Sequence, residues 1–195
     1  VLSAGEASSL NYNRKYFLKM NKVAPVFVKD VPWKTGDTLV QKDLAATLER
    51  IRDNGAKGFY EGETAKLIAE QMKKDQGIIT EEDLKNYQAK NRVQIVFDYK
   101  GNTVVTMPLP SSGGIIIEQM LKMSAMEDIG EMKYGTLQSV QLMTEVERRA
   151  FADRAKYLGD PDFVKVPVKT LVSDSYLKKR MSDYDPSKAG NSKDV

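Results

Sequence analysis

Apolar and polar residues alternate most regularly between residues 93 and 107, and this pattern predicts a pair of antiparallel strands. In Val93–Tyr99 the odd positions are apolar or aromatic and the even positions are mostly polar, which is typical of a strand with one buried face. Lys100–Asn102 predicts the turn, and the β-branched run that opens Thr103–Met107 predicts the returning strand. Pro108 and Pro110 end this strand, because proline cannot donate to a strand ladder.

The N-terminal half follows a helical repeat, interrupted by an irregular segment. Leu44, Leu48 and Ile51 fall at i, i+4 and i+7, so they share one helix face. Thr80–Asp83 resembles a capping box, in which the acidic residues complement the positive end of a helix. Val26–Val28, between two prolines, predicts a short strand. We therefore expect helices over Val1–Met20, from Val40 to Asn54, from Glu63 to about Gly77 and directly after Thr80.

Two helices are predicted in the C-terminal half. The first runs from about Thr136 to Leu158, and the second follows Ser173, which is expected to cap it. Residues 164–171 are expected to be extended around Pro167. On the long helix, the expected inward stripe is Val140, Met143, Val146, Ala150 and Tyr157. Its charged residues are expected to form ion pairs on an exposed face, at spacings of three and four; they are Glu145, Glu147, Arg148, Arg149, Asp153 and Arg154.

The loop Pro110–Gly114 joins the second strand to an apolar helix and allows two interpretations. Free backbone N–H groups at a helix N-terminus, with Gly113 and Gly114 allowing close approach and the hydroxyls of Ser111 and Ser112 nearby, favour an anion site. Alternatively, Ser112 caps the helix and the glycines let strand and helix meet closely. The loop matches neither of the common glycine-rich phosphate-binding motifs.

Composition and charge indicate an ordinary globular protein. The chain has 195 residues, 41% hydrophobic and 29% charged, with a net charge of +3. Its lysines are scattered rather than gathered into a stripe, so we expect no nucleic-acid partner. No apolar run approaches about 20 residues, so we expect no membrane span.

Histidine and cysteine are both absent from the sequence. The chain therefore cannot supply a Ser-His-Asp or Cys-His centre, a thiol redox pair or a typical zinc site. In the turn Gly159–Phe163, Asp160 and Asp162 offer two carboxylates to calcium, but the spaced ligands of an EF-hand are missing, which favours a structural turn. We predict no metal site and no cofactor.

Several stretches, in this order and spacing, resemble the large subunit of γ-glutamyltransferases, also called glutathione hydrolases. The resemblance covers about residues 36 to 185 and is less distinct before that. It rests on Gly36–Gln41, Gly58–Gly62, Gly77–Leu84, Met107–Gly114 and Ala152–Phe163.

The resemblance implies an α+β chain that forms part of the αββα sandwich of an N-terminal-nucleophile hydrolase, mostly helices plus a two-stranded antiparallel unit. In that family the precursor cuts itself into a large and a small subunit. The nucleophile is the threonine that begins the small subunit, and its own α-amine is the base. The γ-glutamyl group of glutathione moves to water or to an amino acid through an acyl-enzyme. Backbone N–H groups stabilise the oxyanion in such chemistry.

Transferring the family's residues to this sequence assigns no catalytic residue to it. The serine and glycine pairs that contact substrate belong to the small subunit, so the loop of Pro110, Ser111, Ser112, Gly113 and Gly114 is expected near the active cleft but outside it. Residues 1–185 are expected to form one incomplete domain of the large subunit, and residues 186–195 a polar tail leading to a small subunit that this chain lacks.

The resemblance also implies partners and a location. The expected partners are the small subunit of the same precursor and a small γ-glutamyl substrate. A homodimer through exposed strand edges is expected where the small subunit is missing. The location implied is periplasmic or secreted.

Overall fold

The computed structural model describes residues 1–194, and Val195, the end of the predicted polar tail, lies outside the described residues. The chain divides into two compact units, Val1–Ala89 and Lys90–Val195. The expected single domain over residues 1–185 stays a prediction.

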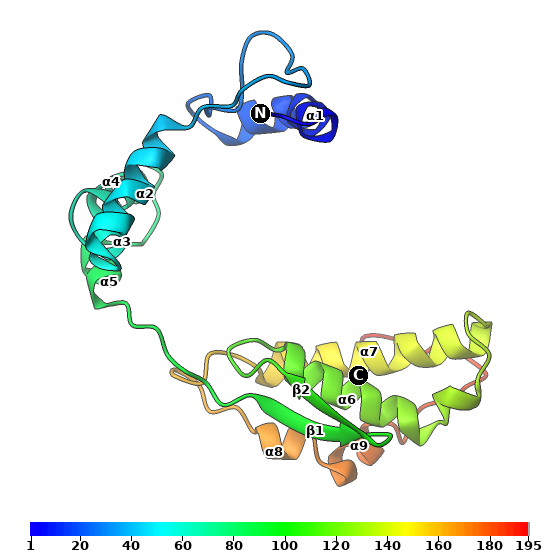
Figure 1. Cartoon of the computed structure of the whole chain (residues 1–195). Coiled ribbons are helices and arrows are strands. Elements are labelled where there is room, and N and C mark those ends of the chain that lie inside the picture. Colours follow the sequence, from blue (N-terminus) through cyan, green and yellow to red (C-terminus); the bar gives the residue numbers. More distant parts are fainter. Residues whose placement is uncertain (195) are drawn as a thin grey trace. The chain divides into compact units, whose positions relative to one another are not determined.

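The first unit consists of helices and connecting turns (Figure 1). The predicted capping box is confirmed: the Thr80 side chain accepts from Asp83 N, and the Asp83 side chain accepts from Thr80 N. The short strand predicted at Val26–Val28 is wrong, because Val28 N closes a turn by donating to Pro25 O over 2.8 Å. Leu44 and Leu48 lie on their helix as expected but are exposed within this unit. The helices are α1 (Ala4–Met20), α2 (Lys42–Asn54), α3 (Lys57–Tyr60), α4 (Gly62–Lys74) and α5 (Glu81–Asn86).

The second unit begins with the predicted hairpin of β1 (Ile95–Tyr99) and β2 (Asn102–Thr106). The strands are antiparallel, with Phe97 opposite Val104 and Tyr99 opposite Asn102. Phe97 is buried, as the alternation predicts, whereas Val93 lies before the strand and is exposed. The hairpin therefore presents one face to the helices of this unit.

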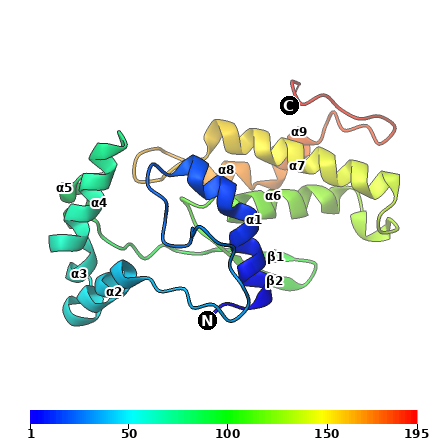
Figure 2. The same ribbon diagram turned by 90° about the horizontal axis from the view of Figure 1, so that it is seen from above.

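Helix α6 (Gly113–Met126) is the centre of the second unit, because it contacts β1, α7, α8 and α9. Helix α7 (Leu137–Tyr157) runs beside it in both views (Figures 1 and 2). A 3-10 turn, η1 (Ile129–Glu131), lies between these two helices. The main cluster of buried apolar residues in this unit contains Ile116, Met123, Leu142, Val146, Ala150, Leu177 and Met181.

Two short helices complete this unit, α8 (Val168–Leu171) and α9 (Asp174–Arg180). The first replaces part of the segment expected to be extended, since Leu171 N and Thr170 N both donate to Pro167 O. The cap predicted for the second is confirmed, because the Ser173 side chain accepts from Tyr176 N.

The inward face of α7 differs from the predicted stripe. Val146 and Ala150 are buried as expected, but Val140 and Met143 are exposed. Three residues that were expected on an exposed charged face are buried instead, because α9 and the C-terminal tail cover them; they are Glu145, Arg149 and Asp153.

Candidate functional site

The loop Pro110–Gly114 links β2 to α6, and its two serines are already engaged. Ser111 Oγ accepts from Gly113 N over 3.3 Å, and Ser112 Oγ accepts from Arg154 Nε over 3.0 Å. The cap predicted for Ser112 is wrong, since its side chain makes no capping hydrogen bond to α6. The hydroxyl turns to the α7 guanidinium instead.

The close approach predicted for the glycines is confirmed at Gly114. A Cβ atom there would lie 2.3 Å from Met107 O and 3.0 Å from both Ile95 Cδ1 and Thr106 Cγ2. No other residue type leaves room for the hairpin backbone at this distance. Gly114 therefore fixes the distance between α6 and the hairpin, and with it the position of the loop.

A cavity of about 300 Å³ lies beside this loop. It contains one cationic side chain, Arg154, and one hydroxyl, that of Ser112. A guanidinium is protonated at all ordinary pH values, so it cannot serve as a base that activates the serine. The chemistry of this cavity is compatible with holding an anion. The lining residues are Pro110, Ser112, Arg154, Ala155, Leu158 and Gly159.

A buried polar network joins α6, α7, α8 and α9. Gln119 Nε2 donates to Asp153 Oδ2 over 2.8 Å and to Leu171 O over 3.0 Å. Tyr176 OH donates to Asp153 Oδ1 over 2.8 Å, and Arg180 Nε lies 3.3 Å from the same oxygen. Burial and the neighbouring Asp153 carboxylate raise the pKa of Tyr176, so its hydroxyl stays a donor.

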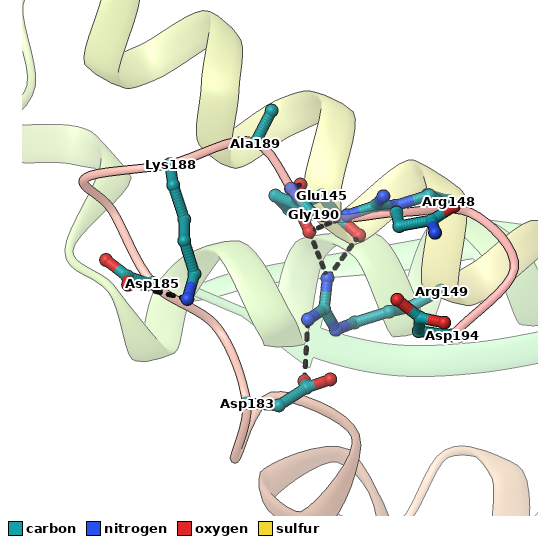
Figure 3. A pocket seen from close by; sticks show the side chains of 10 residues that line it. Glu145, Arg148, Arg149, Asp183, Asp185, Lys188, Ala189, Gly190 and Asp194 are labelled. Carbon is teal, nitrogen blue, oxygen red and sulfur yellow. Dashed lines mark hydrogen bonds and ion pairs between the residues drawn. The ribbon is translucent and has the colours of Figure 1, made fainter.

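A second network lies one helical turn away, at the C-terminal tail (Figure 3). Arg149 Nη1 donates to Glu145 Oε2 over 2.5 Å, and Arg149 Nη2 donates to Asp183 Oδ1 over 2.7 Å. Burial by itself would raise the pKa of Glu145. Hydrogen bonds from Arg149, from Gly190 N and from Arg148 outweigh burial and hold this pKa below its ordinary value.

The cavity in this second region measures about 280 Å³ and is lined by charges of both signs. Its two arginines already have carboxylate partners: Arg148 contacts Glu145, and Arg149 contacts both Glu145 and Asp183. The charges of these two arginines are therefore compensated within the fold, which favours a structural role for the network.

The turn Gly159–Phe163 has a structural role, which is the interpretation that the sequence analysis favoured. Asp162 accepts from both terminal nitrogens of Arg92 and from Lys90 Nζ. These hydrogen bonds hold the pKa of Asp162 well below its ordinary value, and the bonds from Arg92 contribute more than the bond from Lys90.

In residues 1–194, no three acidic side chains come together to hold a metal ion. None of the described helices is long and apolar enough to cross a bilayer.

Sequence reasoning missed both buried networks and the role of Gly190. One signal was present, because Glu145, Arg149 and Asp153 recur every four residues and so share one face of α7. The partners of this face come from α6 and from beyond residue 170, so they could not be read from the helix itself.

Comparison with known proteins identifies relatives of the whole chain. The family model described as gamma-glutamyltranspeptidase matches residues 1–195. The glutathione hydrolase proenzyme of Pseudomonas aeruginosa is 46% identical over 156 residues, covering 79% of this chain and 28% of the relative. The glutathione hydrolase proenzyme of Escherichia coli is 45% identical over 175 residues, covering 90% of this chain and 30% of the relative. This chain thus spans less than a third of these relatives.

Solved structures give the same result. The gamma-glutamyltranspeptidase of Helicobacter pylori superposes with a TM-score of 0.87 at 40% identity, over 99% of this chain and 56% of that chain. The enzyme from Pseudomonas nitroreducens, solved in complex with L-DON, gives a TM-score of 0.86 at 39% identity, over 100% of this chain and 58% of that chain. These neighbours confirm the expected α+β class and its place in the αββα sandwich of N-terminal-nucleophile hydrolases.

Proposed function

Because the chain belongs to the gamma-glutamyltranspeptidase family, we propose that the whole protein transfers or hydrolyses the γ-glutamyl group of glutathione. The match of the family model to all 195 residues is the observation that supports this most directly. In this proposal the present chain is a scaffold of the large subunit, and the γ-glutamyl substrate is bound mainly by residues outside it.

The proposed nucleophile is a threonine outside these 195 residues, which forms an acyl-enzyme and uses its own α-amine as the base. Two observations support this assignment. The sequence has no histidine or cysteine. The serines of the loop are engaged with Gly113 N and with Arg154, neither of which can accept a proton from a hydroxyl.

Turnover of a chromogenic γ-glutamyl anilide tests this proposal. The full-length protein is expected to release the anilide, and the purified 195-residue chain is expected to release none. Circular dichroism first establishes that the purified chain retains its helices. Release of the anilide by the folded chain, at a rate that scales with its concentration, would contradict the proposal.

The small subunit of the same precursor is the proposed partner of the hairpin. The curated relatives are named proenzymes. The hairpin is a sheet of only two strands within the described residues. Val96 and Val105, directly opposite each other on the face away from α6, are 51% and 65% exposed. Further strands covering these edges and this face would remove apolar surface from water.

Without such a partner, the exposed strand edges of the isolated chain are proposed to pair in a homodimer. Sedimentation of the 195-residue chain over a hundredfold concentration range is expected to show this dimer. The Val105→Lys variant, with a charge on the exposed sheet face, is expected to weaken it. A single monomer species at every concentration would refute the dimer.

A periplasmic or secreted location is also proposed, and it rests on kinship to bacterial relatives of this family. Fractionation of the source cells, with activity assayed in each compartment, tests it. Activity confined to the cytoplasmic fraction would contradict it.

The second candidate function is anion binding at the loop Ser111–Gly114. Arg154 favours it, because this cation lies 3.0 Å from Ser112 Oγ at the N-terminus of α6. Titration with sulfate, followed by calorimetry, tests this function in the isolated chain. Saturable binding that is lost in both Arg154→Gln and Gly113→Val would support it, and no heat of binding would exclude it.

A further inference from the structure

The C-terminal tail follows the surface of α7 and is held there by side chains spaced one helical turn apart. Gln141 Nε2 donates to Asp185 O over 3.1 Å and to Lys188 O over 3.0 Å. Gln141 Oε1 accepts from Tyr184 OH over 2.7 Å. Four residues further along α7, Glu145 Oε1 accepts from Gly190 N over 2.9 Å. The tail is therefore bound at both ends of residues 185–190.

Glu145 divides its two oxygens between the tail and the interior. Oε1 accepts the Gly190 N–H, whereas Oε2 faces Arg149 and Arg148 (Figure 3). A hydrogen bond to an ionised carboxylate is stronger than one to a neutral acceptor. One carboxylate thus joins the tail to the ion-pair network that connects α7 with Asp183, just after α9.

Gly190 fits this position because it has no side chain. A Cβ atom there would lie 2.2 Å from Arg148 Nη2 and 3.0 Å from Glu145 Oε2. The guanidinium of Arg148 can move only by leaving the Glu145 carboxylate that it contacts. Any side chain at residue 190 therefore has to displace either the tail or the ion pair.

The tail is held by polar contacts and adds little apolar burial. Pro186, Ser187, Lys188, Ala189 and Gly190 are all exposed. A segment with few buried apolar contacts opens at a low free-energy cost without unfolding the rest of the domain.

From these contacts we propose that residues 185–190 form a releasable strap, docked on α7 through Gln141 and Glu145. Docking of the strap sets where the chain leaves α7 after Gly190. Glu145 and Gly190 are positioning residues in this proposal. The strap is independent of the proposed enzymatic function, because it concerns only contacts within these 195 residues.

Amide hydrogen exchange of the full-length protein, read by mass spectrometry of peptides, tests the strap. In the unmodified protein, the peptide covering residues 186–191 is expected to exchange more slowly than an unstructured peptide. Loss of one hydrogen bond to a charged group corresponds to about tenfold in opening. Glu145→Ala and Gly190→Ala are therefore each expected to speed exchange of this peptide about tenfold.

The matched control is Glu147→Gln, which alters an exposed carboxylate on the same helix. It is expected to leave the peptide unchanged. Glu145→Ala also removes a partner of Arg149, so peptides of α7 are read in the same experiment. If α7 loses protection in Glu145→Ala, faster exchange of the peptide in Gly190→Ala supports the strap, because this variant leaves the Glu145 and Arg149 side chains in place.

Two results would overturn the proposal. The first is a peptide 186–191 that already exchanges at the unstructured rate in the unmodified protein. The second is unchanged exchange of this peptide in both Glu145→Ala and Gly190→Ala. The enzymatic proposal would stand in either case, since anilide turnover measures it separately.

Discussion

Gln119 on α6 donates one side-chain amide nitrogen to both Asp153 Oδ2 on α7 and Leu171 O at the end of α8, over 2.8 Å and 3.0 Å. Both side chains are buried. The amide is one of the groups that allow the Asp153 carboxylate to remain inside the domain, beside Tyr176 OH and Arg180, because a buried carboxylate needs hydrogen-bond partners. The first prediction follows from this pair.

Gln119→Glu replaces the donor with a second carboxylate of nearly the same shape. At pH 8 we expect the free energy of unfolding to fall by about 3 kcal/mol, the range found when a buried charge loses its partner. The second carboxylate adds like-charge repulsion to the loss of the amide donor. Chemical denaturation measures this.

The control for this substitution is Gln138→Glu, which introduces the same charge at an exposed position of α7. It is expected to change the free energy of unfolding by less than about 0.5 kcal/mol. Equal effects of the two substitutions would refute the proposed role of Gln119.

The second prediction compares two adjacent glycines at the start of α6. Gly114→Ala forces a methyl group against Met107 O, an atom of the backbone, and should destabilise the protein by about 2 kcal/mol. Gly113→Ala meets only Ser111 Oγ at 3.5 Å, an ordinary contact, so it should be neutral or stabilising by about 0.5 kcal/mol. Thermal unfolding of both variants measures the difference. A larger loss in Gly113→Ala would contradict the packing described for the hairpin.

The third prediction concerns acid stability. The pKa values of Glu145 and Asp183 are both below their ordinary values. For Glu145, burial raises the pKa, but hydrogen bonds donated by Arg149, Gly190 N and Arg148 outweigh it. For Asp183, the main cause is the hydrogen bond that Arg149 donates. The unfolded chain therefore binds more protons than the folded one as the pH falls below about 4. Stability should be fully present at neutral pH and should decline as the pH falls through these depressed pKa values.

Glu145→Gln should remove part of this pH dependence. Its loss of stability relative to the unmodified protein should be large at pH 7 and should shrink toward pH 3, where Glu145 itself binds a proton on unfolding. Urea denaturation at both pH values measures the difference. A gap between the two proteins that widens toward acid pH would have the wrong sign for a depressed pKa.

Local sequence patterns predicted the elements whose stabilising contacts are also local. The Thr80 capping box, the Ser173 cap and the hairpin each depend on residues within a few positions of one another. The close packing at Gly114 could also be predicted, because a glycine between a strand and a helix indicates that the two approach closely.

The failures at Ser112 and on the inward face of α7 share one physical cause, which is a partner distant in the sequence. Ser112 occupies a cap position, but its hydroxyl accepts a hydrogen bond from Arg154, which lies forty-two residues away in the sequence. Val140 and Met143 fit an apolar stripe, yet α9 and the tail cover the neighbouring face and bury Glu145, Arg149 and Asp153. The periodicity of a sequence shows which side chains are polar. It does not show which distant residue forms hydrogen bonds with a polar side chain that is buried.

We propose that this chain supports a nucleophile that lies outside it. Covalent trapping of the full-length protein with an electrophilic γ-glutamyl analogue, followed by peptide mapping of the modified residue, locates this nucleophile. We expect a single modified threonine outside residues 1–195. A modified residue within this chain, at Ser111, Ser112 or elsewhere, would contradict the proposal.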